Sequence, residues 1–196
     1  SSHLSPHQLG VGTRGGCEAI VHSVRQALQD DPTSSLLQSD FINAFNQANR
    51  DSAFQEVESV FPECLSWVLS SYSSNSQLQF GDTSLSSETG FHQGDPLASL
   101  LFSLVLHPVV KMINEEVPTL KTNAWFLDDG AQVGTREELQ QVVHILEREG
   151  PSRGLHLSTT STVRPPDSPK TTVWCPARPE HDPGDNLLTT VTKVTE

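Results

Sequence analysis

Two adjacent carboxylates, Asp128 and Asp129, stand at the end of the apolar run 124–127 and are followed at once by Gly130. This pattern predicts a strand entering a tight hairpin, with 131–133 as the return strand, because Asp and Gly tolerate the positive φ angles of such turns. Neighbouring like charges repel unless water or a cation neutralises them, so the pair suggests a divalent metal site. Taken alone, the pattern is more commonly an ordinary hairpin tip that binds nothing.

Two other segments offer residues suited to the same chemistry. The apolar segment 36–39 ends in a single carboxylate, Asp40, and a helical pattern follows from Ala44. The glycine-containing segment 90–95 leads through Pro96 into a long apolar helix, since Pro suits the first turn of a helix. A third carboxylate is therefore available to the metal site.

The three segments resemble, in the same order along the chain, the palm motifs of reverse transcriptases. Residues 40–46 read Asp-x-x-x-Ala-Phe-Asn like motif A, residues 90–102 read Gly-x-x-Gln-Gly-Asp-Pro-Leu-x-x-x-Leu-Phe like motif B, and residues 126–129 read Phe-Leu-Asp-Asp like motif C. The non-LTR retrotransposon branch is the most similar. This resemblance implies an RNA-directed DNA polymerase with an α+β palm, a small antiparallel sheet backed by helices, with partial fingers and no thumb.

The resemblance also implies which residues hold metal. Nucleotidyl transfer uses two cations, one that activates the primer 3′-hydroxyl and one that stabilises the triphosphate and the departing pyrophosphate. By analogy with the family, Asp40 and Asp128 bridge both ions and Asp129 supports the primer-side ion. Two Mg²⁺ are expected, with Mn²⁺ as an alternative, because these hard cations prefer oxygen ligands.

Four residues are expected to contact the incoming nucleotide by the same analogy. Phe45 and its motif A neighbour Phe41 lie where the family binds the sugar. A bulky ring at Phe45 would exclude a 2′-hydroxyl and favour dNTPs, although an isolated Phe is more simply a core residue. Gln93 can hydrogen-bond the nucleotide, and Gly94 allows the backbone to approach closely.

The resemblance weakens toward the carboxyl terminus. Residues 154–157 look like the start of motif D, but the Ser-, Thr- and Pro-rich segment 158–169 separates them from the nearest matching lysine. That lysine, Lys170, is expected to protonate the leaving pyrophosphate as a general acid, provided that the chain returns to the site.

The motifs divide the chain into three parts. Residues 1–34 are expected to form a residual fingers segment with a helix, residues 35–176 the palm with motifs A to D, and residues 177–196 a polar, disordered tail. The patterns predict a strand over 36–41, helices from 44 to 60 and from 62, a hairpin over 77–87, a helix after 96 that Pro108 bends or ends, and a helix over 135–149 opened by a capping box.

Composition limits the partners and the compartment. The net charge of −12 over 196 residues is unusual for a nucleic-acid-binding protein, because phosphate affinity depends on Lys and Arg. The expected RNA template, DNA primer and dNTPs would therefore need basic surface from elsewhere, such as the rest of a retroelement polyprotein. The 3 scattered cysteines and the lack of a long apolar run indicate an intracellular protein without a membrane span.

Two alternatives stay open at this point. A decayed or repurposed palm that acts as a binding module would explain the inserted segment 158–169 and the negative charge, whereas the three retained aspartates argue against it. An RNA-dependent RNA polymerase is disfavoured by Phe45 and by the sequence Phe-Leu-Asp-Asp, where such enzymes usually carry Gly-Asp-Asp.

Overall fold

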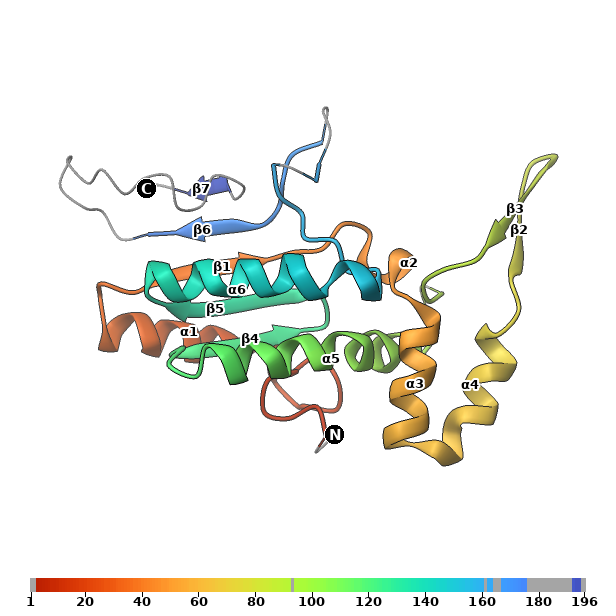
Figure 1. The fold of residues 1–196 in the computed structure, drawn as a ribbon, viewed down its shortest axis with the longest axis horizontal. Helices are drawn as coiled ribbons and strands as arrows, with labels where there is room; N and C mark the ends of the chain where they lie inside the picture. The colour runs from red at the N-terminus through yellow and green to blue at the C-terminus, as the bar shows by residue number, and fades with distance from the viewer. Residues whose placement is uncertain (1–2, 93, 161, 164–166, 176–191, 195–196) are drawn as a thin grey trace.

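The fold combines one five-stranded sheet, helices on both of its faces, and a separate two-stranded arm (Figure 1). It is seen in a computed structural model that describes residues 3–92, 94–160, 162–163, 167–175 and 192–194.

The sheet joins strands that are far apart in the sequence. Its order is β4-β5-β1-β6-β7, and all neighbours are antiparallel except β6 and β7. The strands are β4 (Thr122–Phe126), β5 (Asp129–Gly134), β1 (Ser35–Ser39), β6 (Thr172–Trp174) and β7 (Thr192–Val194). This order places the strand that precedes Asp40 directly beside the strand that begins with Asp129.

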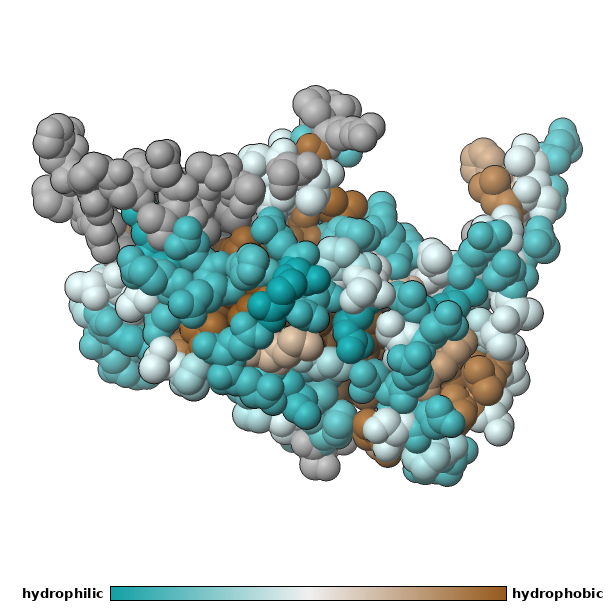
Figure 2. Space-filling model, in the orientation of Figure 1, coloured by the Kyte–Doolittle hydropathy of each residue, from teal (hydrophilic) through white to brown (hydrophobic). Residues whose placement is uncertain are grey.

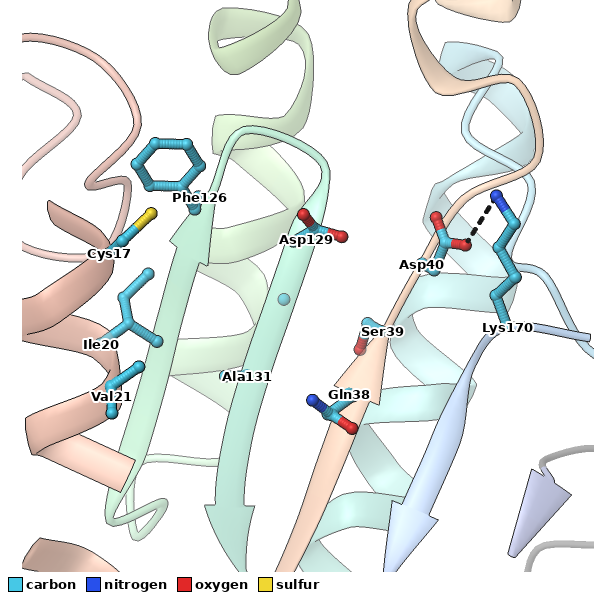
Figure 3. A pocket seen from close by; sticks show the side chains of 11 residues that line it. Cys17, Ile20, Val21, Gln38, Ser39, Asp40, Phe126, Asp129, Ala131 and Lys170 are labelled. Atoms are coloured by element: carbon cyan, nitrogen blue, oxygen red, sulfur yellow. Dashed lines mark ion pairs between the residues drawn. The ribbon is translucent and has the colours of Figure 1, made fainter. Parts of the chain in front are cut away.

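Helices cover the sheet on both faces. The helix α1 (Gly16–Asp30) contacts β4 and β5, whereas α6 (Arg136–Glu149) contacts β5 and β1 and packs on α5 (Ala98–Glu116). Figure 3 shows α1 on the opposite side of the sheet from the other two helices. The predicted capping box opens α6: the Glu138 amide donates to Thr135 Oγ1 at 3.3 Å, and the Thr135 amide donates back to Glu138 Oε2 at 2.7 Å.

Short helices and a hairpin lie beyond one end of the sheet. The helical elements are α2 (Ala44–Gln47), α3 (Arg50–Val60), the 3-10 turn η1 (Pro62–Cys64) and α4 (Leu65–Tyr72), and a further 3-10 turn, η2 (Pro151–Arg153), follows α6. The strands β2 (Ser76–Phe80) and β3 (Thr83–Ser87) form an arm that projects from the body (Figure 1). Figure 2 shows hydrophobic residues on this arm, where Phe80 is 80% and Leu85 is 53% exposed.

The helix α5 runs through Pro108 and does not end there. Proline in a helix interior removes one hydrogen bond and costs about 3 kcal/mol. Leu104, Val105, Val109 and Val110 flank this position and are all buried. Burying each such side chain contributes about 1.5–3 kcal/mol, so burial outweighs the cost of the proline. None of the described helices, α5 included, is long and apolar enough to span a membrane.

The core lies between the sheet and the α5–α6 layer and extends to α3 and α4. Its largest fully buried side chains are Trp125, Tyr72, Phe91, Phe102, Leu37, Leu101, Leu104, Leu106, Ile113, Leu139, Ile145 and Leu146. The centre of the sheet is therefore anchored to the core.

The carboxyl-terminal region contains one short strand that the sequence does not predict. Residues 177–196 are expected to be a disordered tail, but β7 pairs in parallel with β6 inside this range. Within this range the structure describes only these three residues, so the expected tail stays a prediction. Residues 176–191 and 195–196 lie outside the described part of the chain.

Histidines join the amino-terminal segment to α5. His107 is 7% exposed, and its ring centroid lies 4.5 Å from that of His3. Its Nδ1 has no hydrogen-bond partner among the described residues. Burial lowers the pKa of His107 to about 4, and the positive charges of His3, Lys111 and His7 add to this shift. The folded protein therefore keeps His107 neutral.

His107 is expected to weaken the fold in acid. Between its ordinary pKa of 6.5 and its folded pKa of about 4, only the unfolded chain binds this proton, so the free energy of unfolding falls as the pH falls. The full effect corresponds to about 3 kcal/mol. Urea unfolding at about pH 7 and about pH 4.5 should show that His107→Leu removes most of this dependence. Equal pH dependence in the two proteins would contradict the assignment.

Candidate active site

The strands β1 and β5 bring two of the predicted acidic residues to the same end of the sheet. The ladder between these strands ends at the pair Ser39 and Gly130. Continuing the register by one residue sets Asp40 opposite Asp129. Directly opposed residues on antiparallel strands have Cβ atoms about 5 Å apart, so these two carboxylates are cross-strand neighbours.

The turn of the β4–β5 hairpin is made by Leu127 and Asp128, earlier in the chain than predicted. The sequence places the turn at the Asp pair and its glycine, but Asp129 and Gly130 belong to β5. Gly130 is required for space rather than for a turn, because a Cβ there would lie 2.6 Å from the Trp125 ring. The hairpin therefore separates the two acids: Asp128 sits in the turn and Asp129 on the strand.

Asp40 and Asp129 line a cavity of about 500 Å³ between α1 and the sheet, here called the aspartate cavity. Figure 3 shows both carboxylates and the Lys170 ammonium at one end of it. The α1 side chains of Cys17 and Ile20 form part of the opposite wall. The aspartate cavity thus has charged side chains at one end and apolar side chains along one wall.

Negative charge is crowded at this end of the sheet. Burial raises the pKa of Asp128, and the charges of Asp129 and Asp40 raise it further, against a lowering by its own backbone amide and by Lys170. Burial also raises the pKa of Asp129, again with a contribution from Asp40 and with Lys170 opposing. The charge of Asp40 therefore disfavours ionisation of both Asp128 and Asp129, and a bound cation would relieve this repulsion.

Lys170 returns to the site despite the segment inserted before it. Its Nζ lies 3.6 Å from Asp40 Oδ2, and its side chain is 76% exposed. Two residues outside the predicted site, Ser158 and Thr171, hold this return in place. The Ser158 amide donates to the Asp40 carbonyl at 2.8 Å, and the Thr171 hydroxyl donates to the same oxygen at 3.1 Å. The Lys170 amide donates in turn to Ser158 Oγ at 3.0 Å.

The donor chemistry of this site fits a hard divalent cation, but the full ligand set is not assembled. Asp40, Asp128 and Asp129 offer only carboxylate oxygens, which Mg²⁺ and Mn²⁺ prefer. Within the described residues, however, no three His, Cys, Asp or Glu side chains are grouped closely enough to hold a metal ion. The predicted convergence of all three carboxylates is therefore incomplete, and the ammonium of Lys170 supplies the positive charge next to Asp40.

The two motif A phenylalanines occupy different environments. Phe41 is 2% exposed and stacks on Trp125 with ring centroids 6.0 Å apart, so its ring packs in the core rather than facing the cavity. The substrate contact predicted for Phe41 is not supported by this position. Phe45 is half-buried and stacks on Phe102 of α5 at 4.7 Å, which fixes the plane of its ring.

The motif B loop is described except at its glutamine. Gln93 lies outside the described residues. Gly94 has a φ of 91°, and a Cβ there would meet nothing within 4 Å, so backbone on this side is open to a ligand. Gly90, at the start of the loop, has a φ of 70° and is packed against the backbone of Asn46.

Arg50 of α3 holds the entrance to the motif B loop. Arg50 is 7% exposed, and its guanidinium donates to the carbonyls of Gly90 at 2.8 Å, Ser87 at 3.2 Å and Thr89 at 3.2 Å. It also lies over the Tyr72 ring, 5.6 Å from the centroid. These contacts fix the strand-to-loop connection against α3.

Tyr72 holds the other side of the same loop. Its hydroxyl donates to the Asp95 carboxylate and accepts from the His92 amide at 3.3 Å. Burial raises the pKa of Tyr72 to about 12, and the hydrogen bond to Asp95 adds to the shift, so the hydroxyl keeps its proton. Asp95 Oδ1 also accepts from the Leu97 amide at 2.9 Å, which orients the start of α5.

One further residue near the site was not predicted to have a role. Gln8 is 3% exposed, and its side chain bonds to both the amide and the carbonyl of Leu127 in the hairpin turn. The only signal in the sequence is a weak one: the segment 8–10 reads Gln-x-Gly, as do retroelement polymerases before their fingers helix.

Comparison with known proteins agrees with this architecture. The family model for "Reverse transcriptase (RNA-dependent DNA polymerase)" matches residues 2–163. The solved structure of telomerase from Candida albicans with a TWJ fragment of telomeric RNA has a TM-score of 0.61 and 11% identity, and covers 86% of this chain and 33% of the telomerase. The corresponding telomerase from Candida tropicalis has a TM-score of 0.55 and 10% identity, with 71% and 27% covered.

These two structures are similar to the chain in fold, and this similarity confirms the predicted α+β palm. The chain spans no more than about a third of either telomerase. No curated protein matches the sequence.

Proposed function

The chain belongs to the reverse transcriptase family, and on this premise we propose that it is a palm that transfers dNTPs to a primer 3′-hydroxyl by two-metal chemistry. One observation carries the proposal: the β1–β5 ladder ends at Ser39 and Gly130, directly beside Asp40 and Asp129, and Asp128 lies in the adjoining turn. Two sequence segments separated by most of the domain thus bring acidic oxygens to one end of one sheet.

We propose that Asp40, Asp128 and Asp129 hold two Mg²⁺ or Mn²⁺ ions. When bound, these ions supply activation of the hydroxyl nucleophile and stabilisation of the phosphate charge. Asp40 and Asp129 directly adjoin the last pair of the β1–β5 ladder and line the same cavity, which supports a shared ligand role. Lys170, whose exposed ammonium lies 3.6 Å from Asp40 Oδ2, would donate a proton to the departing pyrophosphate.

Selection of dNTPs over NTPs is assigned to Phe45. A ring held by stacking on Phe102 cannot easily swing away, so a 2′-hydroxyl above it would meet fixed carbon atoms. Gln93 and Gly94 are proposed to contact the nucleotide from the motif B side. The open backbone at Gly94 supports this assignment.

The proposed nucleic-acid partners are an RNA template and a DNA primer. The net charge of −12 makes the chain by itself a poor ligand for either strand. We therefore propose that basic surface from other parts of a larger retroelement protein completes the binding site, and that the protein works inside the cell.

Primer extension tests this proposal directly. The chain is incubated with a primed RNA template and either dNTPs or NTPs, over a range of Mg²⁺ and of Mn²⁺. We expect metal-dependent incorporation of dNTPs and none with Asp128→Asn. Incorporation of NTPs at parity would remove the deoxynucleotide assignment, and metal-independent incorporation would remove the two-metal one.

Lys170→Met is expected to slow incorporation more than it weakens binding. Loss of a general acid typically costs about a hundredfold or more in rate, whereas an exposed ion pair contributes little to stability. Single-turnover extension should show a lower maximal rate with a similar dNTP concentration at half saturation. Lys170→Arg keeps the charge but is a much weaker proton donor, so it should be as slow as Lys170→Met if the proton matters. A rate restored by Arg would show that charge alone is required.

The second candidate function is a binding module that no longer polymerises. The pairing of Lys170 with Asp40, in place of a complete carboxylate cluster, favours it. In the same assays this candidate predicts metal binding that depends on the aspartates, together with no extension under any condition.

A further inference from the structure

The hairpin turn between β4 and β5 has an unusual backbone conformation. Phe126 pairs with Asp129, which leaves only Leu127 and Asp128 to form the turn. Leu127 has a φ of 56°, in the left-handed region that residues other than glycine, Asn and Asp rarely adopt. A leucine here has no local hydrogen bond of its own side chain to favour this conformation. Something else must hold it.

The side chain of Gln8 meets both polar backbone groups of that leucine. The Leu127 amide donates to Gln8 Oε1 at 2.8 Å, and Gln8 Nε2 donates to the Leu127 carbonyl at 3.0 Å. The Gly10 amide donates to the same Oε1 at 2.9 Å, which fixes the orientation of the side-chain amide. Gln8 is 3% exposed, so water does not compete for these bonds.

The backbone around Gln8 is itself fixed on the edge of the sheet. The Leu9 amide donates to the Trp125 carbonyl at 2.7 Å, and the Trp125 amide donates to the His7 carbonyl at 2.7 Å. Gly10 then passes so close to the turn that a Cβ would lie 2.7 Å from the Leu127 nitrogen. Segment 7–10 therefore forms a rigid support from which Gln8 reaches the turn.

We propose that Gln8 is a positioning residue, whose amide holds Leu127 in the left-handed conformation and thereby directs Asp128 and Asp129 toward Asp40. This inference rests on the proposed function only for its consequence, which is metal binding. Glutamate cannot replace Gln8, because its carboxylate would face the Leu127 carbonyl without a proton to donate.

The conformation of Leu127 can be measured without reference to catalysis. A residue with positive φ gives a strong intraresidue NOE between its amide and α protons. We expect this signal for Leu127 in the wild-type chain and its loss in Gln8→Met, which keeps the length and removes the hydrogen bonds. Gln26→Met, on the exposed face of α1, is the matched control and should leave the signal unchanged. A strong Leu127 NOE in Gln8→Met would overturn the proposal.

A second measurement separates positioning from general support of the fold. Removing a group that orients metal ligands typically weakens metal binding by about 10–100-fold. We expect this loss of Mn²⁺ affinity in Gln8→Met, and electron paramagnetic resonance of Mn²⁺ measures it. Leu127→Gly adopts positive φ freely. In that background, Gln8→Met should therefore weaken Mn²⁺ binding by less than about threefold. Equal losses in both backgrounds would contradict positioning.

The outcomes distinguish this inference from the proposed function. If the wild-type chain binds Mn²⁺ but extends no primer, polymerisation by the chain alone is disproved, while the Mn²⁺ comparison still decides the role of Gln8. If Gln8→Met does not fold, Gln8→Glu takes its place. That variant keeps the acceptor for the Leu127 and Gly10 amides, and it should still lose the Leu127 NOE at neutral pH. Retention of the NOE in Gln8→Glu would again overturn the proposal.

Discussion

Asp40→Asn is expected to lower metal-dependent dNTP incorporation about a thousandfold while making the metal-free protein more stable. The loss of rate follows from removing a ligand of both ions, because metal stabilisation of the transition state is worth several kcal/mol and about 4 kcal/mol is a thousandfold. The gain in stability follows from the charges. Asp40 raises the pKa of both Asp128 and Asp129, so removing its charge relieves repulsion.

The ion pair between Asp40 and Lys170 does not offset this gain, because the lysine is 76% exposed and such pairs contribute little. Single-turnover extension and thermal unfolding without metal measure the two effects. Asp82→Asn, on the exposed tip of the β2–β3 arm, makes the same change of charge and should alter neither. A lower melting temperature for Asp40→Asn, or activity within about tenfold of wild type, would contradict the assignment.

Gly90→Ala is expected to cause the largest loss of stability, about 3 kcal/mol or more. A Cβ at this position would lie 2.4 Å from the backbone of both Phe45 and Asn46, which cannot move without displacing motif A. The φ of 70° adds strain for any residue but glycine. The Gly90 amide also donates to the Ala48 carbonyl at 2.9 Å, and a shift of the loop would break that bond.

Gly94→Ala provides the comparison within the same loop. Its φ of 91° is also unfavourable for alanine, but a Cβ there meets nothing within 4 Å. We expect a cost of about 1–2 kcal/mol from strain alone. Urea unfolding of the two variants measures the difference. Equal losses would show that the contact between motifs A and B does not constrain the loop.

Local signals in the sequence were sufficient for much of the fold. The capping box at Thr135 and Glu138 satisfies the first amides of α6, and the helix starts and ends where the pattern indicates. The hairpin around Gly81 also follows from residues next to one another in the chain. These elements depend on contacts within a few residues, which a single sequence displays directly.

The site depends on contacts that no local pattern reveals. The hairpin turn falls on Leu127 rather than on the Asp-Gly pair because Gln8, 119 residues away, holds that leucine in place. Lys170 lies beside Asp40 because Ser158 and Thr171 close the inserted loop. The sequence motifs therefore predict the acids, and only the structure shows which strands and turns carry them.

A crystal of the chain soaked with Mn²⁺ and a dNTP tests the central claim most directly. Anomalous scattering locates manganese independently of any catalytic assay. The account predicts manganese peaks between Asp40 and the pair Asp128 and Asp129, with Lys170 displaced from Asp40. Manganese bound elsewhere, with the Asp40–Lys170 pair intact and dNTP incorporation preserved in solution, would contradict the account.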